Sequence, residues 1–327
     1  MPQVLDEMTA PDSKGLRPNQ FVYNAAISAC DKAGQWRAAL DVGERMAAAG
    51  WVWDVVTYNA TLSALGRAGQ WLQCKALMER MRAARVAPNT VTYSTLITAA
   101  ERSGQTDEAL QAFDDMRQQG VAPNLVTYNA LMTACDRGKE WEWAEEVFEH
   151  MRAAGLQGNT VTFTALMTSC VKGGEWQRAL VAYDLMLEAE VEPNLHTFNV
   201  LLSAHQAGGQ WEEVDAVVEE MRRRGVSLNS VTYTVLITGC AARRRTDMAR
   251  ELHARMVSEG VPRNAYTFTA LITAHSKCGD WQQALAAFDE MIAAGVPVTT
   301  VPLNAALGAC EAGCQWQVRV YIFRRTT

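Results

Sequence analysis

Small hydrogen-bonding side chains recur along the chain in steps of 35 residues. Only Asn, Ser and Thr occupy this column, which holds Asn24, Asn59, Ser94, Asn129, Thr164, Asn199, Thr234, Thr269 and Asn304. An amide offers a hydrogen-bond donor and an acceptor, whereas a hydroxyl is smaller and rotates. Because these residues are mediocre helix formers, a column selected for packing would hold Ala or Leu instead. The restriction indicates hydrogen bonding, either to a ligand or, as the alternative, within the start of the residue's own helix.

A second polar column follows the first one at a distance of 30 residues. Its members are Asp54, Asn89, Asn124, Asn159, Asn194, Asn229, Asn264 and Thr299. Each member immediately precedes a predicted helix, where Asn and Asp are favoured N-caps. Capping alone would explain this column. Capping and ligand binding are nevertheless compatible, because an N-cap lies at the end of the helix that carries the first column.

A third column is basic, although the formal net charge of the chain is −6. Its members are Lys32, Arg67, Arg102, Arg137, Lys172 and Lys277. The acidic balance argues against indiscriminate binding to polyanions, but it leaves room for a local basic stripe. The competing interpretation is that these cations sit at helix ends, where the helix dipole favours them.

The elements that must position these columns are helices in a repeat. A period of this length is typical of a solenoid, and each unit reads as two helices separated by a glycine-containing turn. The first helix starts at the opening residue of the unit and runs about 13 residues; the second starts at a tryptophan such as Trp36 or Trp141. We therefore predict an all-α fold, an α-solenoid of about nine helix–turn–helix repeats. The units are 20–54, 55–89, 90–124, 125–159, 160–194, 195–229, 230–264, 265–299 and a partial unit, 300–313.

The stretches before and after the array, which spans 20–313, do not contain a complete repeat. Residues 1–19 resemble the second helix and loop of a partial N-terminal repeat, so the start has the appearance of a cut into a longer array. Because this stretch carries Asp6, Glu7 and Asp12, no targeting peptide is visible in it. Residues 314–327 form an irregular C-terminal tail. No apolar run of about 18 residues exists, so we expect no contact with a membrane.

Other periodic residues are expected to serve packing. A methionine column fills gaps between helices, and the cysteine column that includes Cys30 and Cys135 alternates with Ala, Leu and His, which predicts core packing without disulfides. Cys310 and Cys314 lack the partners of a zinc site, so we predict no metal, no cofactor and no catalytic residue. Arg85, Glu190 and the pair Arg243-Arg244 stand where other units have glycine, and we expect altered loop geometry there.

Units such as LVTYNALMTACDRGKEWEWAEEVFEHMRAAGLQGN, residues 125–159, resemble the pentatricopeptide repeat. The match extends over 20–313 without a slip in register. The tetratricopeptide repeat, the nearest rival, has a period of about 34 residues and a different signature. The resemblance implies a right-handed superhelix whose groove binds single-stranded RNA, one base per repeat. It also implies that the fifth and last residues of a unit read the base, the second sandwiches it and the thirteenth approaches phosphate.

Carried onto this sequence, the resemblance assigns a role to each column. The predicted base-reading residues are Asn24, Asp54, Asn59, Asn89, Ser94, Asn124, Asn129, Asn159, Thr164, Asn194, Asn199, Asn229, Thr234, Asn264, Thr269 and Thr299. The predicted base-stacking residues are Phe21, Val56, Val91, Val126, Val161, His196, Val231 and Tyr266, with core packing as the alternative for the valines. The predicted phosphate contacts are the six basic residues named above. The implied target preference is 5′-U-Y-A-Y-A-Y-A-3′, where Y is a pyrimidine.

The resemblance also implies a cellular role. Such proteins act mostly in mitochondria or plastids, in RNA processing, stability, splicing or translation. Some relatives carry a C-terminal deaminase or nuclease domain, but this chain has no His-x-Glu with Cys-x-x-Cys, so we do not expect an enzyme. The alternative function is a protein–protein interaction scaffold of tetratricopeptide-like type, which would instead predict peptide-carboxylate clamps of Lys and Asn.

Overall fold

The structure is a computed structural model that describes residues 18–138 and 140–312. The expected partial repeat over residues 1–19 therefore lies almost wholly outside the described residues, and so does the tail from 314. The described part consists of α-helices and contains no strand, which confirms the all-α helical-repeat fold.

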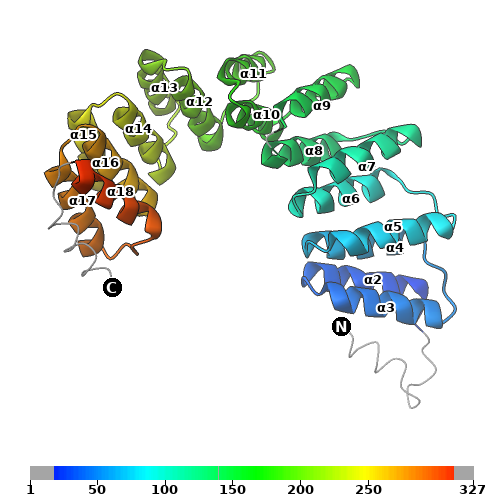
Figure 1. Cartoon of the computed structure of the whole chain (residues 1–327). Helices are drawn as coiled ribbons and strands as arrows, with labels where there is room; N and C mark the ends of the chain where they lie inside the picture. The colour runs from blue at the N-terminus through cyan, green and yellow to red at the C-terminus, as the bar shows by residue number, and fades with distance from the viewer. Residues whose placement is uncertain (1–17, 139, 313–327) are drawn as a thin grey trace. The chain divides into compact units, whose positions relative to one another are not determined.

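Each 35-residue unit contributes two helices (Figure 1). The first helices of the units are α2 (Gln20–Lys32), α4 (Val55–Arg67), α6 (Thr90–Arg102), α8 (Leu125–Gly138), α10 (Thr160–Gly173), α12 (Leu195–Ala207), α14 (Ser230–Ala242), α16 (Ala265–Lys277) and α18 (Thr300–Ala312). The second helices are α3 (Trp36–Ala48), α5 (Trp71–Ala83), α7 (Thr106–Gln118), α9 (Trp141–Ala153), α11 (Trp176–Glu188), α13 (Trp211–Arg223), α15 (Thr246–Ser258) and α17 (Trp281–Ala293). The predicted helix starts are confirmed.

Local signals in the sequence account for these boundaries. Eight first helices begin after an Asn or Asp whose side chain accepts a hydrogen bond from a backbone N–H of the first turn. The second helices end where the chain enters the left-handed region, as at Gly120 with φ of 68°. There the N–H of Val121 donates to the carbonyl of Met116 at 3.0 Å, which closes the helix in a Schellman-type motif.

The loops without glycine correct one expectation. Three other residues adopt the same left-handed conformation, with φ of 55° to 56°: Arg85, Glu190 and Arg244. At the first of these loops, Val86 N–H still donates to the Met81 carbonyl at 3.1 Å. The expectation of altered loop geometry is therefore wrong, because the hydrogen bonds that close the helix impose this conformation on a residue for which it is strained.

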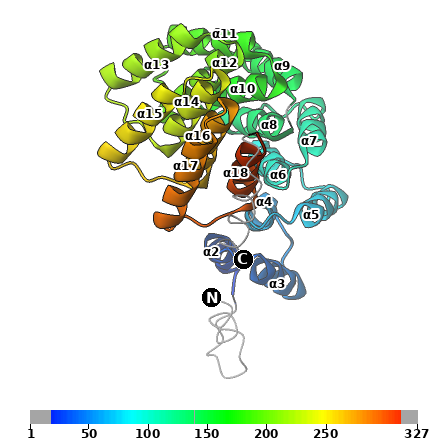
Figure 2. The same ribbon diagram turned by 60° about the vertical axis from the view of Figure 1, so that its left-hand side comes forward.

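The chain divides into two compact bodies, residues 1–191 and 192–327. Within each body, the first helices pack side by side in one layer: α4 lies between α2 and α6, and α16 lies between α14 and α18. The second helices pack against this layer, each beside the first helix of its own unit (Figures 1 and 2). The three polar columns of the sequence all belong to the layer of first helices or to the residues that precede it.

The core lies between the two layers. The methionine column, from Met46 to Met291, is buried in every unit, as predicted. Cys135 and Cys170 are buried and free, and burial raises the pKa of each thiol to about 12. These cysteines therefore act as small apolar residues, in agreement with their predicted packing role.

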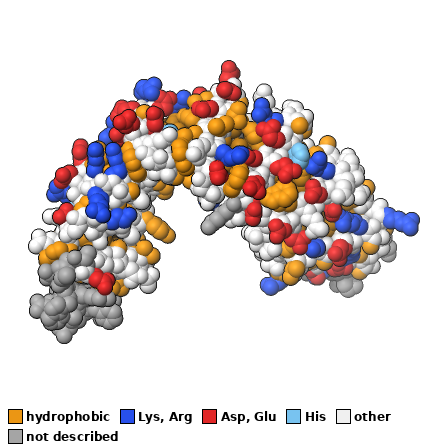
Figure 3. Space-filling view, turned by 45° about the horizontal axis from the view of Figure 1, so that its top comes forward, with side chains coloured by type: hydrophobic (Ala, Val, Ile, Leu, Met, Phe, Trp, Pro, Cys, Tyr) orange, Lys and Arg blue, Asp and Glu red, His pale blue; other side chains and the backbone are white. Residues whose placement is uncertain are grey.

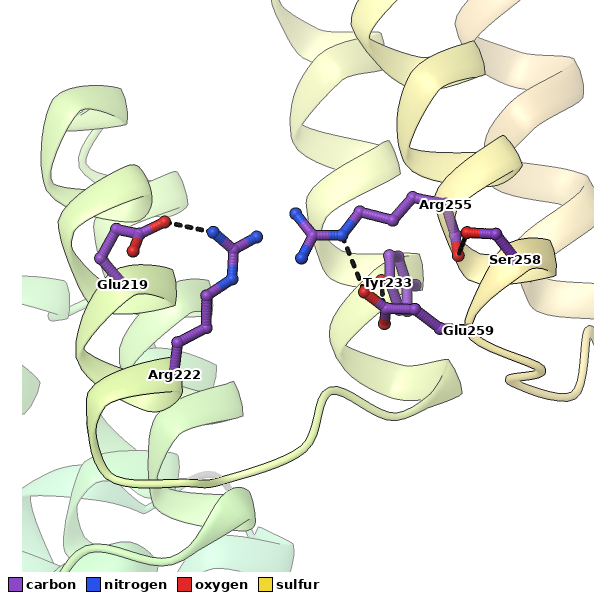
Figure 4. A network of polar contacts seen from close by, with 6 residues as sticks. All are labelled: Glu219, Arg222, Tyr233, Arg255, Ser258 and Glu259. Atoms are coloured by element: carbon purple, nitrogen blue, oxygen red, sulfur yellow. Dashed lines mark hydrogen bonds and ion pairs between the residues drawn. The ribbon is translucent and has the colours of Figure 1, made fainter.

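Ion pairs and hydrogen bonds join the second helices, here called the outer layer, to one another and to the first helices. In the first body, Lys75 of α5 pairs with Glu108 of α7 at 2.9 Å. In the second body, the Tyr233 hydroxyl of α14 donates to Glu259 Oε2 at 2.6 Å, just beyond α15 (Figure 4). Burial, together with this carboxylate, raises the pKa of Tyr233 to about 12. The first contact links neighbouring units, and the second joins the two layers within one unit.

Candidate functional site

The second residue of each unit is exposed, although it is apolar in most units. Phe21 and Tyr266 are 78% and 74% exposed, and the six valines of this column, Val301 included, are 51% to 59% exposed. The valines therefore do not pack in the core, and that alternative is wrong. Figure 3 shows acidic and basic side chains interspersed over the face in view, with hydrophobic side chains among them. A row of exposed apolar side chains at one position of most units indicates a surface for a repetitive ligand.

The clearest example is a pocket of 290 Å³ in the first body. Its lining includes residues from all the predicted roles: the stacking residues Val91 and Val126, the reading pair Ser94 and Asn124, and the cations Arg67 and Arg102. Two apolar side chains, two hydrogen-bonding side chains and two guanidinium groups thus surround one space. Its volume is near the lower end of small-molecule sites, roughly 300–1,000 Å³, which suits a single flat ring.

The two polar columns meet within one unit, as their spacing predicts. The Asn59 amide nitrogen lies 3.3 Å from Asn89 Oδ1, and Ser94 Oγ lies 3.5 Å from Asn124 Oδ1. In the fourth unit, Asn129 Nδ2 lies 3.5 Å from Asn159 Oδ1. Three predicted pairs are therefore in direct contact. The exposed fraction of the side chain differs along the first column. Three of its members, Ser94, Thr164 and Asn199, are largely buried.

The second polar column also caps helices. In the units from the second to the eighth, its Asp or Asn side chain accepts a hydrogen bond from the backbone N–H three residues later, at 2.8 to 3.1 Å. The capping interpretation is thus confirmed. Capping uses the side-chain oxygen, and the amide nitrogen of Asn89 has no protein partner within the described part of the chain. That nitrogen is available to a ligand.

A column of threonines joins the polar columns across unit boundaries, and the sequence reasoning missed it. Each of these threonines is the third residue of its unit, is fully buried and bonds to the fifth residue of the preceding unit. We call them the bridging threonines: Thr57, Thr92, Thr127, Thr162, Thr232 and Thr267. The bond to an asparagine oxygen measures 2.5 to 2.8 Å. The available signal was that Thr occupies this place in seven successive units.

Threonine members of the first column also bond locally. The hydroxyls of Thr164, Thr234 and Thr269 each donate to the carbonyl four residues earlier in the same helix, at 2.6 to 2.7 Å. The local alternative thus holds for these threonines. The asparagines Asn24, Asn59, Asn129 and Asn199 bond instead to the bridging threonine of the next unit, with their oxygens as acceptors.

Three of the six basic residues are already paired with acids. Arg67 lies 3.3 Å from Asp31, Arg137 lies 3.0 Å from Glu101 and Lys172 lies 2.8 Å from Asp136. In each case the acid precedes the cation by 36 residues, in the preceding unit. Arg137 also donates to the carbonyl of Glu101 at 2.8 Å, so the helix-end interpretation applies to it.

The other three cations have no such partner. Lys32, Arg102 and Lys277 make no ion pair with any residue among those the structure describes. For Arg102 the reason is visible in the sequence, because the residue 36 positions earlier is Gly66. Only these three predicted phosphate contacts therefore carry a charge that no carboxylate of the described chain neutralises.

The other five predicted reading pairs are not joined by a described bond: Asn24 with Asp54, Thr164 with Asn194, Asn199 with Asn229, Thr234 with Asn264 and Thr269 with Thr299. Thr164 belongs to the first body and Asn194, which caps α12, to the second. Thr269 and Thr299 share no described hydrogen bond, and Pro302 stands where other units have a bridging threonine. Among residues 18–138 and 140–312, no three metal-ligating side chains gather. None of the helices in that part combines the length and apolarity that crossing a bilayer requires.

Comparisons with known proteins agree with this architecture. A family model described as the pentacotripeptide-repeat region of PRORP matches residues 12–178 and 157–326. The crystal structure of the pentatricopeptide repeat protein PPR10 from maize is similar, with 22% identity and a TM-score of 0.55 over 98% of this chain and 55% of PPR10. This chain thus spans about half the length of that protein.

A second similar structure is the PPR domain of Arabidopsis thaliana protein-only RNase P 1, solved in complex with tRNA. It shares 18% identity with a TM-score of 0.50, over 59% of this chain and 95% of that domain. Both structural likenesses show the fold. No curated protein gives a significant match.

Proposed function

Because the chain belongs to the pentatricopeptide repeat family, we propose that it binds single-stranded RNA with one base per unit. The observation that carries the proposal is the pocket between Val91 and Val126. Two apolar side chains clamp a base from both faces, while Ser94 and Asn124 meet its edge and Arg102 meets a phosphate. The tRNA complex of the similar Arabidopsis PPR domain supports RNA as the ligand class.

The hydrogen bonds suggest how an Asn–Asn pair selects its base. In the second unit, Asn59 Oδ1 accepts from the Thr92 hydroxyl and Asn89 Oδ1 accepts from the Thr92 backbone. These bonds turn both oxygens toward Thr92, so the pair presents N–H donors to the ligand. Cytosine presents the adjacent acceptors O2 and N3 on its pairing edge, which suits two donors. We therefore assign a pyrimidine, with cytosine before uracil, to the Asn–Asn units.

The reading pair of the first unit contains a carboxylate where the Asn–Asn units have an amide. Asp54 replaces asparagine there, and a carboxylate only accepts hydrogen bonds. Uracil carries an N–H on its pairing edge, so an Asn–Asp pair suits uracil, with the base taking the place of Gln20, whose side-chain amide donates to Asp54 Oδ2 at 2.7 Å. Units with Ser94 or Thr234 offer a hydroxyl in place of an amide, and we assign adenine to them from the family pattern. The proposed preference over seven units remains 5′-U-Y-A-Y-A-Y-A-3′.

The energy of such binding is sufficient. Stacking contributes roughly 1–3 kcal/mol per base, so seven bases supply about 7–21 kcal/mol against an association cost of about 4–15 kcal/mol. We expect dissociation constants between about 1 μM and 1 nM.

A filter-binding assay tests the proposal with labelled 5′-UCACACA-3′ and a scrambled RNA of the same composition. Tighter binding of the first RNA is expected. Equal binding of both RNAs would contradict the assigned preference. The absence of binding to either would contradict RNA as the ligand and favour the protein-scaffold alternative.

We also propose a cellular role on the basis of family membership. The protein acts on transcripts in a mitochondrion or plastid, in RNA processing, stability, splicing or translation. Imaging of a fluorescent fusion of the full-length protein tests the compartment, and sequencing of the RNA that copurifies with it tests the transcripts. A fusion that accumulates elsewhere would contradict the organellar assignment.

A further inference from the structure

We infer that the bridging threonines are positioning residues that set the base selectivity of the unit preceding them. The inference rests on the proposed function, because it concerns how the reading side chain is held. Its consequence is that base selectivity is not a property of one unit alone. Each reader is oriented by a residue that lies 33 positions later in the chain.

The fourth unit shows the geometry. Thr162 is fully buried, and its hydroxyl lies 2.5 Å from Asn129 Oδ1. The same oxygen atom accepts the backbone N–H of Asn159 at 3.1 Å. A hydroxyl has a single proton to donate and two lone pairs. With the short contact to Asn129 taking that proton, Thr162 acts as donor toward the reader and as acceptor toward the cap.

This arrangement allows one orientation of the reading amide. With its oxygen engaged by Thr162, the Asn129 amide turns its nitrogen toward Asn159 Oδ1, 3.5 Å away, and toward the ligand side. The reverse orientation would place the Asn129 oxygen beside the oxygen of Asn159, where two acceptors repel each other. The bridge therefore determines that the reader offers donors rather than an acceptor.

Loss of the bridge should weaken selectivity more than affinity. An amide that rotates freely offers either a donor or an acceptor, so it satisfies the edge of a purine as well as that of a pyrimidine. The stacking contacts from Val126 and Val161 do not involve the bridge and would persist. Affinity for the preferred RNA thus falls little, while RNAs with the wrong base bind better.

The end of the array provides a natural contrast. Pro302 has no hydroxyl, and Thr269 in the preceding unit donates to the carbonyl of Ala265 at 2.7 Å instead. We therefore infer that the eighth unit is the least selective of the complete units whose reader lies in the second body.

The test compares Thr162→Val, which removes the hydroxyl but keeps the shape, with Thr162→Ser, which restores it. The matched control is Thr133→Val, because the Thr133 hydroxyl donates only to a carbonyl within α8. Dissociation constants are measured for RNAs with C or A at the fourth base and, separately, at the second base. Circular dichroism verifies that each variant is folded.

The wild type should prefer C to A by roughly tenfold at both positions. In Thr162→Val the ratio at the fourth base should fall below about threefold, with the second base unchanged, whereas Thr162→Ser and Thr133→Val should retain it. A retained ratio in Thr162→Val, or an equal fall at both bases, would overturn the inference. Should Thr162→Val not fold, Thr92→Val applies the same test to the second base. If the wild type binds no RNA, the proposed function itself fails.

Discussion

The salt dependence of RNA binding measures how many of the six basic residues neutralise phosphate. Each cation that contacts a phosphate of a single strand contributes about −0.7 to the slope of log K against log salt. If all six did so, the slope would be about −4.2. Because Arg67, Arg137 and Lys172 are paired with acids, we expect only three to contribute, which lowers the slope to about −2.1.

The perturbation is the combined variant Asp31→Asn, Glu101→Gln and Asp136→Asn. It removes the three carboxylates and frees the three cations for phosphate. Asp31 and Glu101 are buried, but the side chains of their arginine partners are about half exposed, so water solvates the freed charges. The variant should therefore fold, with a slope near −4.2 by the same calculation.

Fluorescence anisotropy with a labelled 5′-UCACACA-3′ RNA gives the slope between about 50 and 200 mM salt. Over this range the affinity of the wild type should fall about 20-fold and that of the variant about 300-fold. At the lowest salt the variant should bind more tightly than the wild type.

A matched control variant changes the net charge of the protein by the same amount, but its three substitutions lie in the outer layer. The variant Glu108→Gln, Asp115→Asn and Glu145→Gln removes acids paired with Lys75, Arg82 and Arg178. It should leave the slope near that of the wild type. A wild-type slope near −4, or the same slope in both combined variants, would refute the assignment of paired and unpaired cations.

Three further predictions concern other parts of the chain. Thr234→Asn should shift the preference at the seventh base from adenine to a pyrimidine with little change in melting temperature, as measured with RNAs that vary at that base. Replacing Arg85 by Gly should stabilise the protein by about 1 kcal/mol in urea denaturation, because glycine adopts the left-handed conformation without strain. Burial lowers the pKa of His253 and His275, so the unfolded chain takes up protons first, and the free energy of unfolding should fall as the pH drops below about 6.5. His275→Cys should reduce that pH dependence; an unchanged dependence would contradict the role of His275.

Much of the fold was predictable from the sequence because its signals are local. An Asn before most first helices and a Gly after most second helices act within a few residues, and their 35-residue recurrence indicates a repeat. The contact between Asn59 and Asn89 was also predictable, since both residues belong to one unit. The loops at Arg85 and Glu190 were not, because the hydrogen bonds that close the helix outweigh the preference of the residue.

The exposure of the valines also needed the structure. Val91 and Val126 are apolar residues at a helix start, and the sequence is compatible with either a core or a surface position. Packing decides between them, because the first helices turn this face away from both their neighbours and the second layer. The same packing creates the pocket between the two valines.

The sequence by itself determined the repeat, the helices and the residue types that line up in each column. Only the tertiary structure decided which columns of different units touch. Thr162 meets Asn129 across 33 residues and Arg137 meets Glu101 across 36. These offsets depend on the angle at which one helix pair packs against the next. Side-chain packing between units sets this angle, and no signal within one unit does so.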